Sequence, residues 1–507
     1  GPVFLSNGVL AAGAAVTLAN PVSLGGGPLP VALSGSALTL TGLNVVAGNT
    51  ALSVNNATTV TGDLGGAGAL SLTSQPVVTT AGSLSGAAGN LTVTAPVSTT
   101  GPVAVSAGRL TLSGNGALPA VVTTPAVQTI SMTKVTSGNF QLTFAGQTTA
   151  AIAFNATPAT TAAAIQTALQ ALPALGANVA VAATAASTAN NQYFTVTFGG
   201  TLAGLAQPTM TIINSGPLTA SANVVRLSVA TTTPGATGLA VNAGGTVTLD
   251  NTAVNNTNRL NDAAAVALNG GTLSLLGSAA APSSETLGTL VLAGGASTVF
   301  TQAGAGQTVL FTTTGAARSP GATVNFTAGG GQVLGSAANQ VVIAGIPPAG
   351  LSVGGVLPFA TVTDAATVAG NTSGFNLATA TGGASSSIAA LTTYNASNVL
   401  VTSSQVLTGT VNAVLVVGDG VSVTGASLAV TSGQIAAAGG NTTANTIGVS
   451  ALSLGSASVL GAPEGFLTAY ANAATAAPAG GNLRVTGTVS GKVKGGLTVL
   501  VNGIRAF

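Results

Sequence analysis

The sequence predicts a mainly β protein: a parallel β-helix (β-solenoid) rod that carries one small inserted α+β module. Of its 507 residues, 46% are hydrophobic and 3% are charged, a balance that favours folding over disorder. Short β-branched runs end at Gly, Asn or Pro roughly every ten residues, so two or three runs would make one coil. Hairpin sandwiches have similar spacing, but the small and β-branched residues suit stacked, similar layers.

Residues 1–123 form the N-terminal part of the predicted solenoid. Their sequence is a succession of strand-like runs in which apolar and polar residues alternate, for example PVALSGSALTLTG and GPVAVSAGRLTLSG. Almost no aromatic residue interrupts them. Each coil would therefore pack on a neighbour of nearly the same shape, as repeat architectures require.

Residues 124–234 differ in composition and are predicted to form the inserted α+β module. Aromatic residues concentrate here, in Phe140–Phe144 and Tyr193–Phe198, which indicates a separate small core. The apolar residues Ile165, Leu169 and Leu172 fall at helical spacing, so we expect a helix over about 158–172. An insertion of this kind disturbs the stack little if its two ends return close together.

Residues 235–507 return to strand-like runs, and part of them resembles a known family. The segments Asn258–Asp262, Ala267–Leu273 and Glu285–Leu290, with Gly294-Gly295, resemble the autotransporter-associated β-strand repeat of large bacterial surface proteins. The resemblance covers about 235–335, with a weaker echo in 480–503 that lacks the family's Lys-x-Gly pattern. It implies a right-handed parallel β-helix that projects from the cell, and hence an extracellular or bacterial cell-surface location.

The amino-acid composition argues against most kinds of catalytic, metal-binding and nucleic-acid-binding site. The chain has no His and no Cys, so it cannot hold a Ser/His/Asp or Cys/His catalytic arrangement or a typical zinc site. Its nine Lys/Arg and seven Asp/Glu residues are scattered, which argues against a nucleic-acid surface, and no apolar run is long enough for a membrane-spanning helix. We therefore expect no enzyme activity, no catalytic or metal-binding residue and no cofactor.

Two alternatives remain for the few charged residues. A carbohydrate-active β-helix enzyme needs only two carboxylates, and Asp262 and Glu285, with Arg259 nearby, are the candidates. The ordinary interpretation is that Arg259 and Asp262 pair in a turn while Glu285 caps a coil. Calcium at Asp250 and Asn251, or at Asp419, is conceivable, although each position offers few of the six to eight oxygens required.

The two ends of the chain predict self-assembly. Residues 1–12 (GPVFLSNGVLAA) and 496–507 (GLTVLVNGIRAF) match at Gly, Leu, Asn-Gly and Ala, and neither end carries a charged cap. We expect the units to stack head to tail as subunits or segments of an extracellular bacterial fibre or surface layer. The expected interface residues are Gly1, Pro2, Val3, Phe4, Leu5, Leu497, Val499, Leu500, Val501, Ile504 and Phe507.

A second interpretation is an adhesin or stalk, in which the rod presents the inserted module to the cell surface or extracellular matrix. The missing His also predicts that assembly is nearly indifferent to pH between about 5 and 8, since no ordinary group titrates there.

Overall fold

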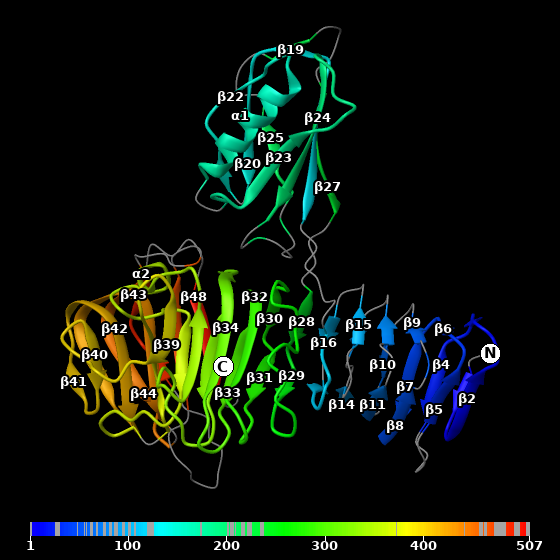
Figure 1. Ribbon diagram of the computed structural model, residues 1–507. Coiled ribbons are helices and arrows are strands. Elements are labelled where there is room, and N and C mark those ends of the chain that lie inside the picture. The colour runs from blue at the N-terminus through cyan, green and yellow to red at the C-terminus, as the bar shows by residue number, and fades with distance from the viewer. Residues whose placement is uncertain are drawn as a thin grey trace. The chain divides into compact units, whose positions relative to one another are not determined.

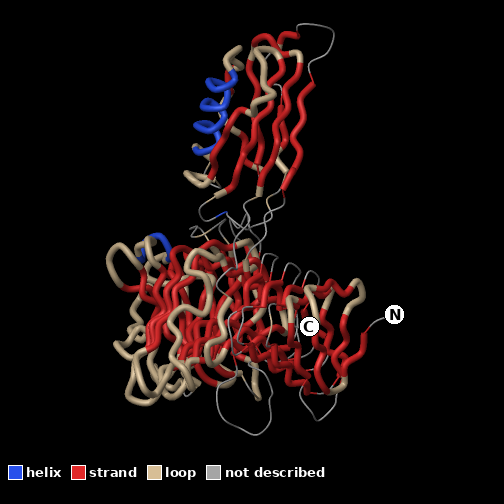
Figure 2. The backbone as a smooth tube through the Cα atoms, turned by 45° about the vertical axis from the view of Figure 1, so that its right-hand side comes forward, coloured by secondary structure: helices blue, strands red, loops and turns tan. Residues whose placement is uncertain are grey.

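The chain is mainly β, as the sequence predicts, and its computed structural model divides it into two compact units. Unit 1 comprises 1–121 and 239–507, and unit 2 comprises 122–238. Figure 2 shows strands throughout both units. The structure describes residues 3–502 except 26–30, 48, 55, 57, 61–63, 67–68, 75–77, 81–83, 86–89, 94–96, 100–102, 106–107, 119–125, 145, 173–174, 200–201, 203–206, 208, 214–217, 221–225, 234–237, 372, 441, 456–459, 461–463, 471–482 and 491–496.

Parallel strand ladders form the first part of unit 1, which we call the first stack (Figure 1). One ladder consists of β1 (Val3–Leu5), β4 (Val22–Gly25), β7 (Leu43–Ala47), β10 (Leu64–Gly66), β13 (Leu84–Ser85), β16 (Val103–Val105), β28 (Leu239–Asn242), β30 (Val266–Asn269), β32 (Ser283–Gly294) and β34 (Val309–Arg318). A second consists of β2 (Gly8–Ala12), β5 (Val31–Gly35), β8 (Asn49–Val54), β11 (Ala69–Ser74), β14 (Asn90–Val93), β17 (Gly108–Leu112), β29 (Gly245–Asp250), β31 (Thr272–Leu276), β33 (Ala296–Gln302), β35 (Thr323–Ala328) and β37 (Ala360–Thr363).

A third set of parallel pairs accompanies the two ladders in parts of the first stack. It begins with β3 (Val16–Leu18), β6 (Leu38–Leu40), β9 (Thr58–Val60), β12 (Val78–Thr80) and β15 (Val97–Thr99). After a parallel bridge between Leu118 and Leu260, the first halves of β32 and β34 and then β36 (Asn339–Ile343) make further parallel pairs. Three successive strands such as β4, β5 and β6 pair with the three before them and the three after them, and we call each such set a layer.

Alternation of side chains explains why these runs pair in this register. In β5 and β6, residues at every second position are fully buried, as in Val31, Leu33, Leu38 and Leu40. Because a strand's side-chain period is two, a slip of one residue would expose the whole apolar set. Apolar columns therefore fix the register, as where Val22 lies beside Leu43.

The inserted unit does not interrupt the ladders. Val103, before unit 2, pairs directly with Leu239, after it, and Leu110 pairs with Val247. At the base of unit 2, Val127 pairs with Thr233, so the two ends of the insertion return together. The backbone of the first stack thus satisfies its hydrogen bonds as if unit 2 were a long loop.

Unit 2 has its own sheets, helix and core. An antiparallel sheet has the order β23 (Val179–Ala183), β24 (Asn191–Phe198), β18 (Val127–Thr133) and β27 (Arg226–Thr233). β20 (Asn139–Phe144) pairs with β21 (Gln147–Thr148), β22 (Ile152–Ala153) and β25 (Thr211–Ile213), and β19 (Val135–Ser137) pairs with β26 (Thr219–Ala220). Helix α1 (Pro158–Gln170) buries Ile165 and Leu169 in a core that also contains Phe140, Phe194 and the stacked Phe144–Phe198 pair.

Antiparallel strands close the far end of the first stack. After α2 (Pro348–Leu351) and β37, the strand β38 (Phe375–Thr381) pairs antiparallel with β37 and with β39 (Ser386–Ala390). β39 in turn pairs antiparallel with β36. We call β38 and β39 the cap strands.

The remaining strands form a second stack of parallel pairs. One ladder consists of β40 (Asn398–Val401), β42 (Gly409–Gly418), the last part of β43 (Ser422–Gly439), β45 (Gly465–Tyr470) and β48 (Leu497–Asn502). The other pairings join β41 (Gln405–Val406), β43, β44 (Asn445–Leu454), β46 (Leu483–Val485) and β47 (Thr488–Ser490). Its apolar core is largely separate from that of the first stack.

Candidate functional site: buried charges and open strand edges

Arg259 is the largest fully buried side chain of the described residues, and it joins the layers on either side of the insertion. Its guanidinium donates to Gly116 O at 2.7 Å, to Asp250 O at 2.6 Å and to Asn251 Oδ1 at 2.6 Å. It also donates to the carbonyl oxygens of Gly114 and Val254. Since Gly114 and Gly116 precede unit 2 and Arg259 follows it, this side chain fastens the first stack across the point of insertion.

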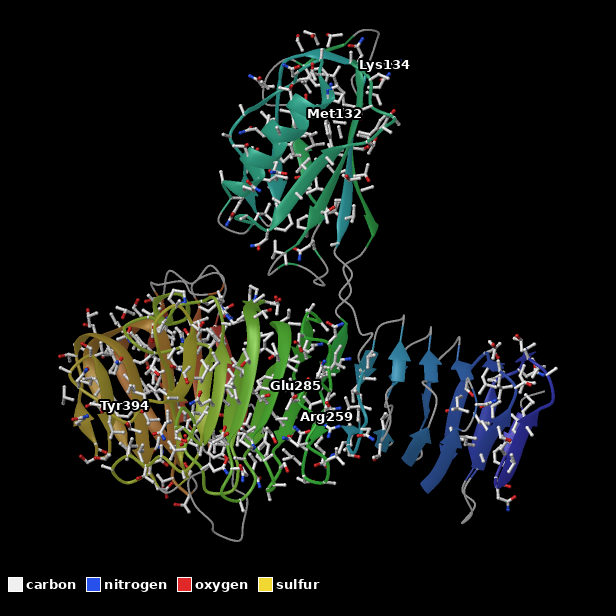
Figure 3. All side chains as sticks on the ribbon, in the orientation of Figure 1. Met132, Lys134, Arg259, Glu285 and Tyr394 are labelled. Atoms are coloured by element: carbon white, nitrogen blue, oxygen red, sulfur yellow. The ribbon has the colours of Figure 1, made fainter. Side chains whose placement is uncertain are left out.

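Glu285 is fully buried beside Arg259 (Figure 3) and binds backbone rather than side chain. The amide of Leu260 donates to Oε1 at 2.7 Å, and the amide of Arg259 donates to Oε1 at 3.1 Å and to Oε2 at 3.0 Å. Burial raises the pKa of Glu285 to about 7, although these amides and the Arg259 charge oppose the shift. The expectation that no group titrates between pH 5 and 8 is therefore wrong for Glu285, because desolvation disfavours its charged form.

The structure does not bring the two candidate catalytic carboxylates to one surface. Asp262 is exposed, whereas Glu285 has no exposed area and already accepts two backbone amides. Arg259 does not turn toward Asp262 but uses its guanidinium within the network around Gly116. A glycoside reaction needs both carboxyl groups to reach the sugar, and a fully buried Glu285 cannot.

The positions considered for calcium are used in turns. Asp250 Oδ1 accepts from the amide and hydroxyl of Thr252, and Asn251 Oδ1 accepts from Arg259. Asp419 accepts from the amides of Thr442 and Thr443. Within the described part of the chain no three acidic residues gather as a group that could hold a metal ion.

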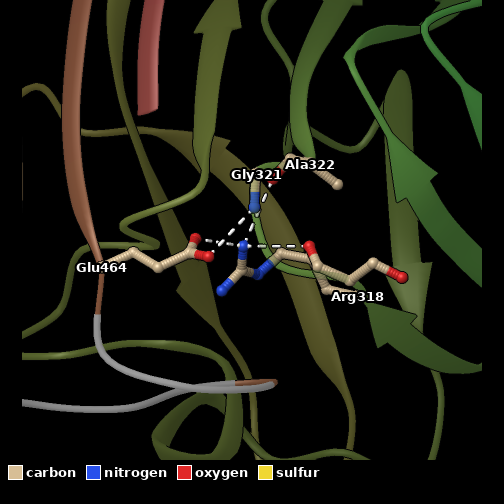
Figure 4. A network of polar contacts seen from close by, with 5 residues as sticks. Arg318, Gly321, Ala322 and Glu464 are labelled. Atoms are coloured by element: carbon tan, nitrogen blue, oxygen red, sulfur yellow. Dashed lines mark hydrogen bonds and ion pairs between the residues drawn. The ribbon is translucent and has the colours of Figure 1, made fainter. Parts of the chain in front are cut away.

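An ion pair that the sequence analysis missed joins the two stacks. Arg318 Nη1 lies 2.6 Å from Glu464 Oε2, with both side chains almost completely buried (Figure 4). Glu464 Oε1 also accepts from the amide of Gly321 at 3.0 Å. The guanidinium carbon lies 5.4 Å from the ring centroids of both Phe359 and Phe466, a cation–π geometry. The two residues are 146 positions apart, so no local sequence pattern predicts that they pair, and their only distinguishing feature in the sequence is that charged residues are rare.

The first layer of the first stack presents an open edge. Among the described strands, β1 pairs only with β4, β2 only with β5 and β3 only with β6. Each of these edge strands exposes a large apolar side chain: Phe4 is 59%, Val9 64% and Val16 42% exposed. Residues 3–18, which contain these three strands, include no charged side chain, so the edge lacks the charges that normally block strand addition.

The predicted interface residues that the structure describes lie in β1 and β48, the first and the last described strands of unit 1. Val3 and Leu5 are partly buried against the core of the first stack, and Phe4 is exposed. Leu497 begins β48, which pairs only with β45 among the described strands, and its side chain is 47% exposed. The backbones of Val499, Leu500 and Val501 belong to β48, whereas Gly1, Pro2, Ile504 and Phe507 lie outside the described residues.

Comparison with known proteins gives no match: no family model fits the sequence, and no curated protein is similar to it. The resemblance to the autotransporter-associated repeat therefore remains a prediction. None of the helices in the described part of the chain has the length and hydropathy that a membrane span requires.

Proposed function

We propose that this chain is a structural subunit of an extracellular bacterial fibre or surface layer, built as a parallel β-solenoid that self-assembles through its open strand edges. The continuous parallel ladders from β1 to β34 and from β2 to β37 support the solenoid architecture. Scarce charge, no Cys and few Lys or Arg suit a material that is independent of redox state and offers few sites to trypsin-like proteases.

The observation that carries the proposal is the open edge of β1, β2 and β3. Natural proteins protect such edges with charges, prolines, bulges or covering loops. Here Phe4, Val9 and Val16 are exposed on three adjoining edge strands, and no charge lies within the first 62 residues. An edge that is both apolar and rich in unpaired backbone groups favours the addition of further strands.

A second candidate function is favoured by the independence of unit 2. This unit has its own core and is inserted without a break in the ladders, so unit 1 can act as a stalk that presents it to a cell surface or matrix. Replacement of 122–238 by a short linker separates the two functions. Assembly that persists without unit 2 supports the structural role, and loss of surface binding with assembly intact supports the adhesin.

Sedimentation velocity over a wide concentration range, with electron microscopy of the same samples, tests the proposal. We expect assemblies of the purified chain that dissociate on dilution. The variant Val9→Lys adds a charge to the open edge and should abolish them, whereas Val254→Lys changes an equally apolar, exposed side chain away from any strand. A chain that stays monomeric at every concentration contradicts the proposal.

A further inference from the structure

The net charge of the chain lies entirely in unit 2. All seven Asp and Glu residues belong to unit 1, together with seven of the nine Lys and Arg residues, so the formal side-chain charges of unit 1 cancel. Unit 2 has no acidic residue and contributes the remaining two cations, Lys134 and Arg226. Because no carboxylate of unit 2 can pair with either cation, their positive field is available to a ligand.

The two cations lie at the same end of the unit 2 sheet. Thr133, the last residue of β18, pairs with Arg226, the first residue of β27, and Lys134 directly follows Thr133. The Cα atoms of the two cations are therefore within about 9 Å, since paired residues lie about 5 Å apart and successive Cα atoms about 3.8 Å. The connections to unit 1 leave from the other end of these strands, where Val127 pairs with Thr233. Figure 3 shows Lys134 at the free end of unit 2.

Lys134 has a backbone conformation that lysine rarely adopts. Its φ is +63°, and among the described residues Leu460 is the only other non-glycine residue with a positive φ. Glycine takes such positions at no steric cost, and this chain uses glycine freely. An exposed lysine at a turn where glycine would be less strained indicates that its side chain serves a purpose other than folding.

Neutral hydrogen-bonding groups surround the two cations. The exposed hydroxyls of Thr136, Ser137 and Thr219 form a cluster, in which Thr219 Oγ1 lies 2.7 Å from Thr136 Oγ1 and 2.6 Å from Ser137 Oγ. On the solvent-facing side of β18 and β24, the partly exposed Tyr193 pairs with Ser131. Sugars present hydroxyls and apolar C–H faces, which hydroxyl groups and an aromatic ring can bind.

We propose that this end of unit 2, which we call the cationic tip, binds an acidic polysaccharide. Lys134 and Arg226 would bind its carboxylate or sulfate groups, and the neighbouring hydroxyls its sugar rings. Two cations suit an acidic sugar chain better than a nucleic acid, whose phosphate backbone needs several cations on one face. The inference goes beyond the proposed assembly and does not depend on it, because unit 2 has its own core and needs no second copy to form the tip.

Titration of the full chain with short oligosaccharides tests the inference, since short ligands do not bridge assembled copies. The probes are an oligogalacturonate, a sulfated maltooligosaccharide and, as the matched neutral control, the same maltooligosaccharide without sulfate. Saturable binding of either acidic probe that weakens as salt is added supports the proposal and identifies the acidic group. Equal binding of the neutral sugar, or tighter binding of an oligothymidylate of equal charge, would overturn it.

Lys134→Gly separates binding from folding, because glycine adopts this φ without strain and the melting temperature should not fall. We expect Lys134→Gly and Arg226→Gln each to weaken binding roughly three- to fivefold, the effect of losing one exposed ion pair. Arg109→Gln and Arg484→Gln, at exposed arginines of unit 1, should leave binding unchanged.

Two results would overturn the cationic tip. One is that neither acidic probe binds, and the other is that the Lys134→Gly and Arg226→Gln variants bind as tightly as the unmodified chain. Both results leave the proposed self-assembly standing, since sedimentation of the chain without any sugar tests that assembly separately.

Discussion

Removal of one partner from the Arg318–Glu464 pair should open the contact between the two stacks. Both side chains are nearly inaccessible, with 2% and 0% of their area exposed, and the atoms lie 2.6 Å apart. Glu464→Gln keeps an oxygen for the Gly321 amide but leaves the guanidinium without a counter-charge. An orphaned buried charge costs about 3–5 kcal/mol, so we expect a loss of this size.

A double variant distinguishes charge pairing from simple packing. Arg318→Met places a flexible apolar side chain against Phe359 and Phe466, where the guanidinium now lies. Combined with Glu464→Gln it removes both charges, and replacement of a whole buried pair is often nearly neutral. The double variant should therefore lose much less stability than the sum of the two single variants.

Hydrogen exchange of the β45 amides is the direct assay, since β45 follows Glu464 and lies at the contact. A loss of about 3–5 kcal/mol corresponds to exchange that is roughly 150- to 4,000-fold faster where opening is local. Tyrosine fluorescence adds a second readout, because Tyr470 of β45 stacks on Phe375 at 4.8 Å, and Tyr193→Phe removes the signal of unit 2. Arg484→Met, at an exposed arginine, is the control. Single-variant losses below about 1 kcal/mol, or strictly additive losses, would refute the reasoning.

Three further changes test other parts of the structure. The raised pKa of Glu285 means that the folded state binds its proton more tightly than the unfolded state does. The free energy of unfolding should therefore fall by up to about 3 kcal/mol as the pH rises from 4.5 through 7. Urea titrations at several pH values should show this slope, and Glu285→Gln should remove it. Gly245→Ala places a Cβ against Val105 O, closer than van der Waals contact allows, and should cost about 1–3 kcal/mol, whereas Gly13→Ala meets nothing within 4 Å and should be neutral in the same titration. Replacement of 122–238 by a short linker should leave the melting transition of unit 1 unchanged, because Val103 already pairs with Leu239, and a shift of many degrees would contradict this.

Sequence alone predicts the local structure of this chain well, because the period-two alternation of apolar residues is strong and turn-forming Gly, Asn and Pro residues recur at short intervals. The runs that contain Val31 to Leu40 alternate buried and less buried residues, as expected for strands packed on one face. The helix expected over 158–172 runs from Pro158 to Gln170, between a proline start and a buried Leu172. In both places the signal lies within about fifteen residues, which is the range over which periodicity acts.

Long-range arrangement leaves no such signal. Nothing near Glu464 in the sequence indicates Arg318. The strands β38 and β39 pair antiparallel, yet their residues are as apolar as those of the parallel strands. Strand direction is set by how the chain returns, and composition does not encode that return.

Five of the seven carboxylates, those of Asp250, Glu285, Asp364, Asp419 and Glu464, share one structural role. Inside the ladders each backbone amide finds a carbonyl in the next layer, so no side-chain acceptor is needed. Where the layers are interrupted, carboxylates accept from backbone amides in place of those carbonyls. The amides that donate are those of Leu260 after the insertion, Gly321 at the contact between the stacks, Leu334 before the cap strands, and Thr252 and Thr442 in turns. Charge therefore marks the irregular points of a regular structure. Among the described strands each strand of the first layer has one neighbour, and none carries a charged residue, so under the proposed self-assembly a strand of another chain would take the place of the second neighbour.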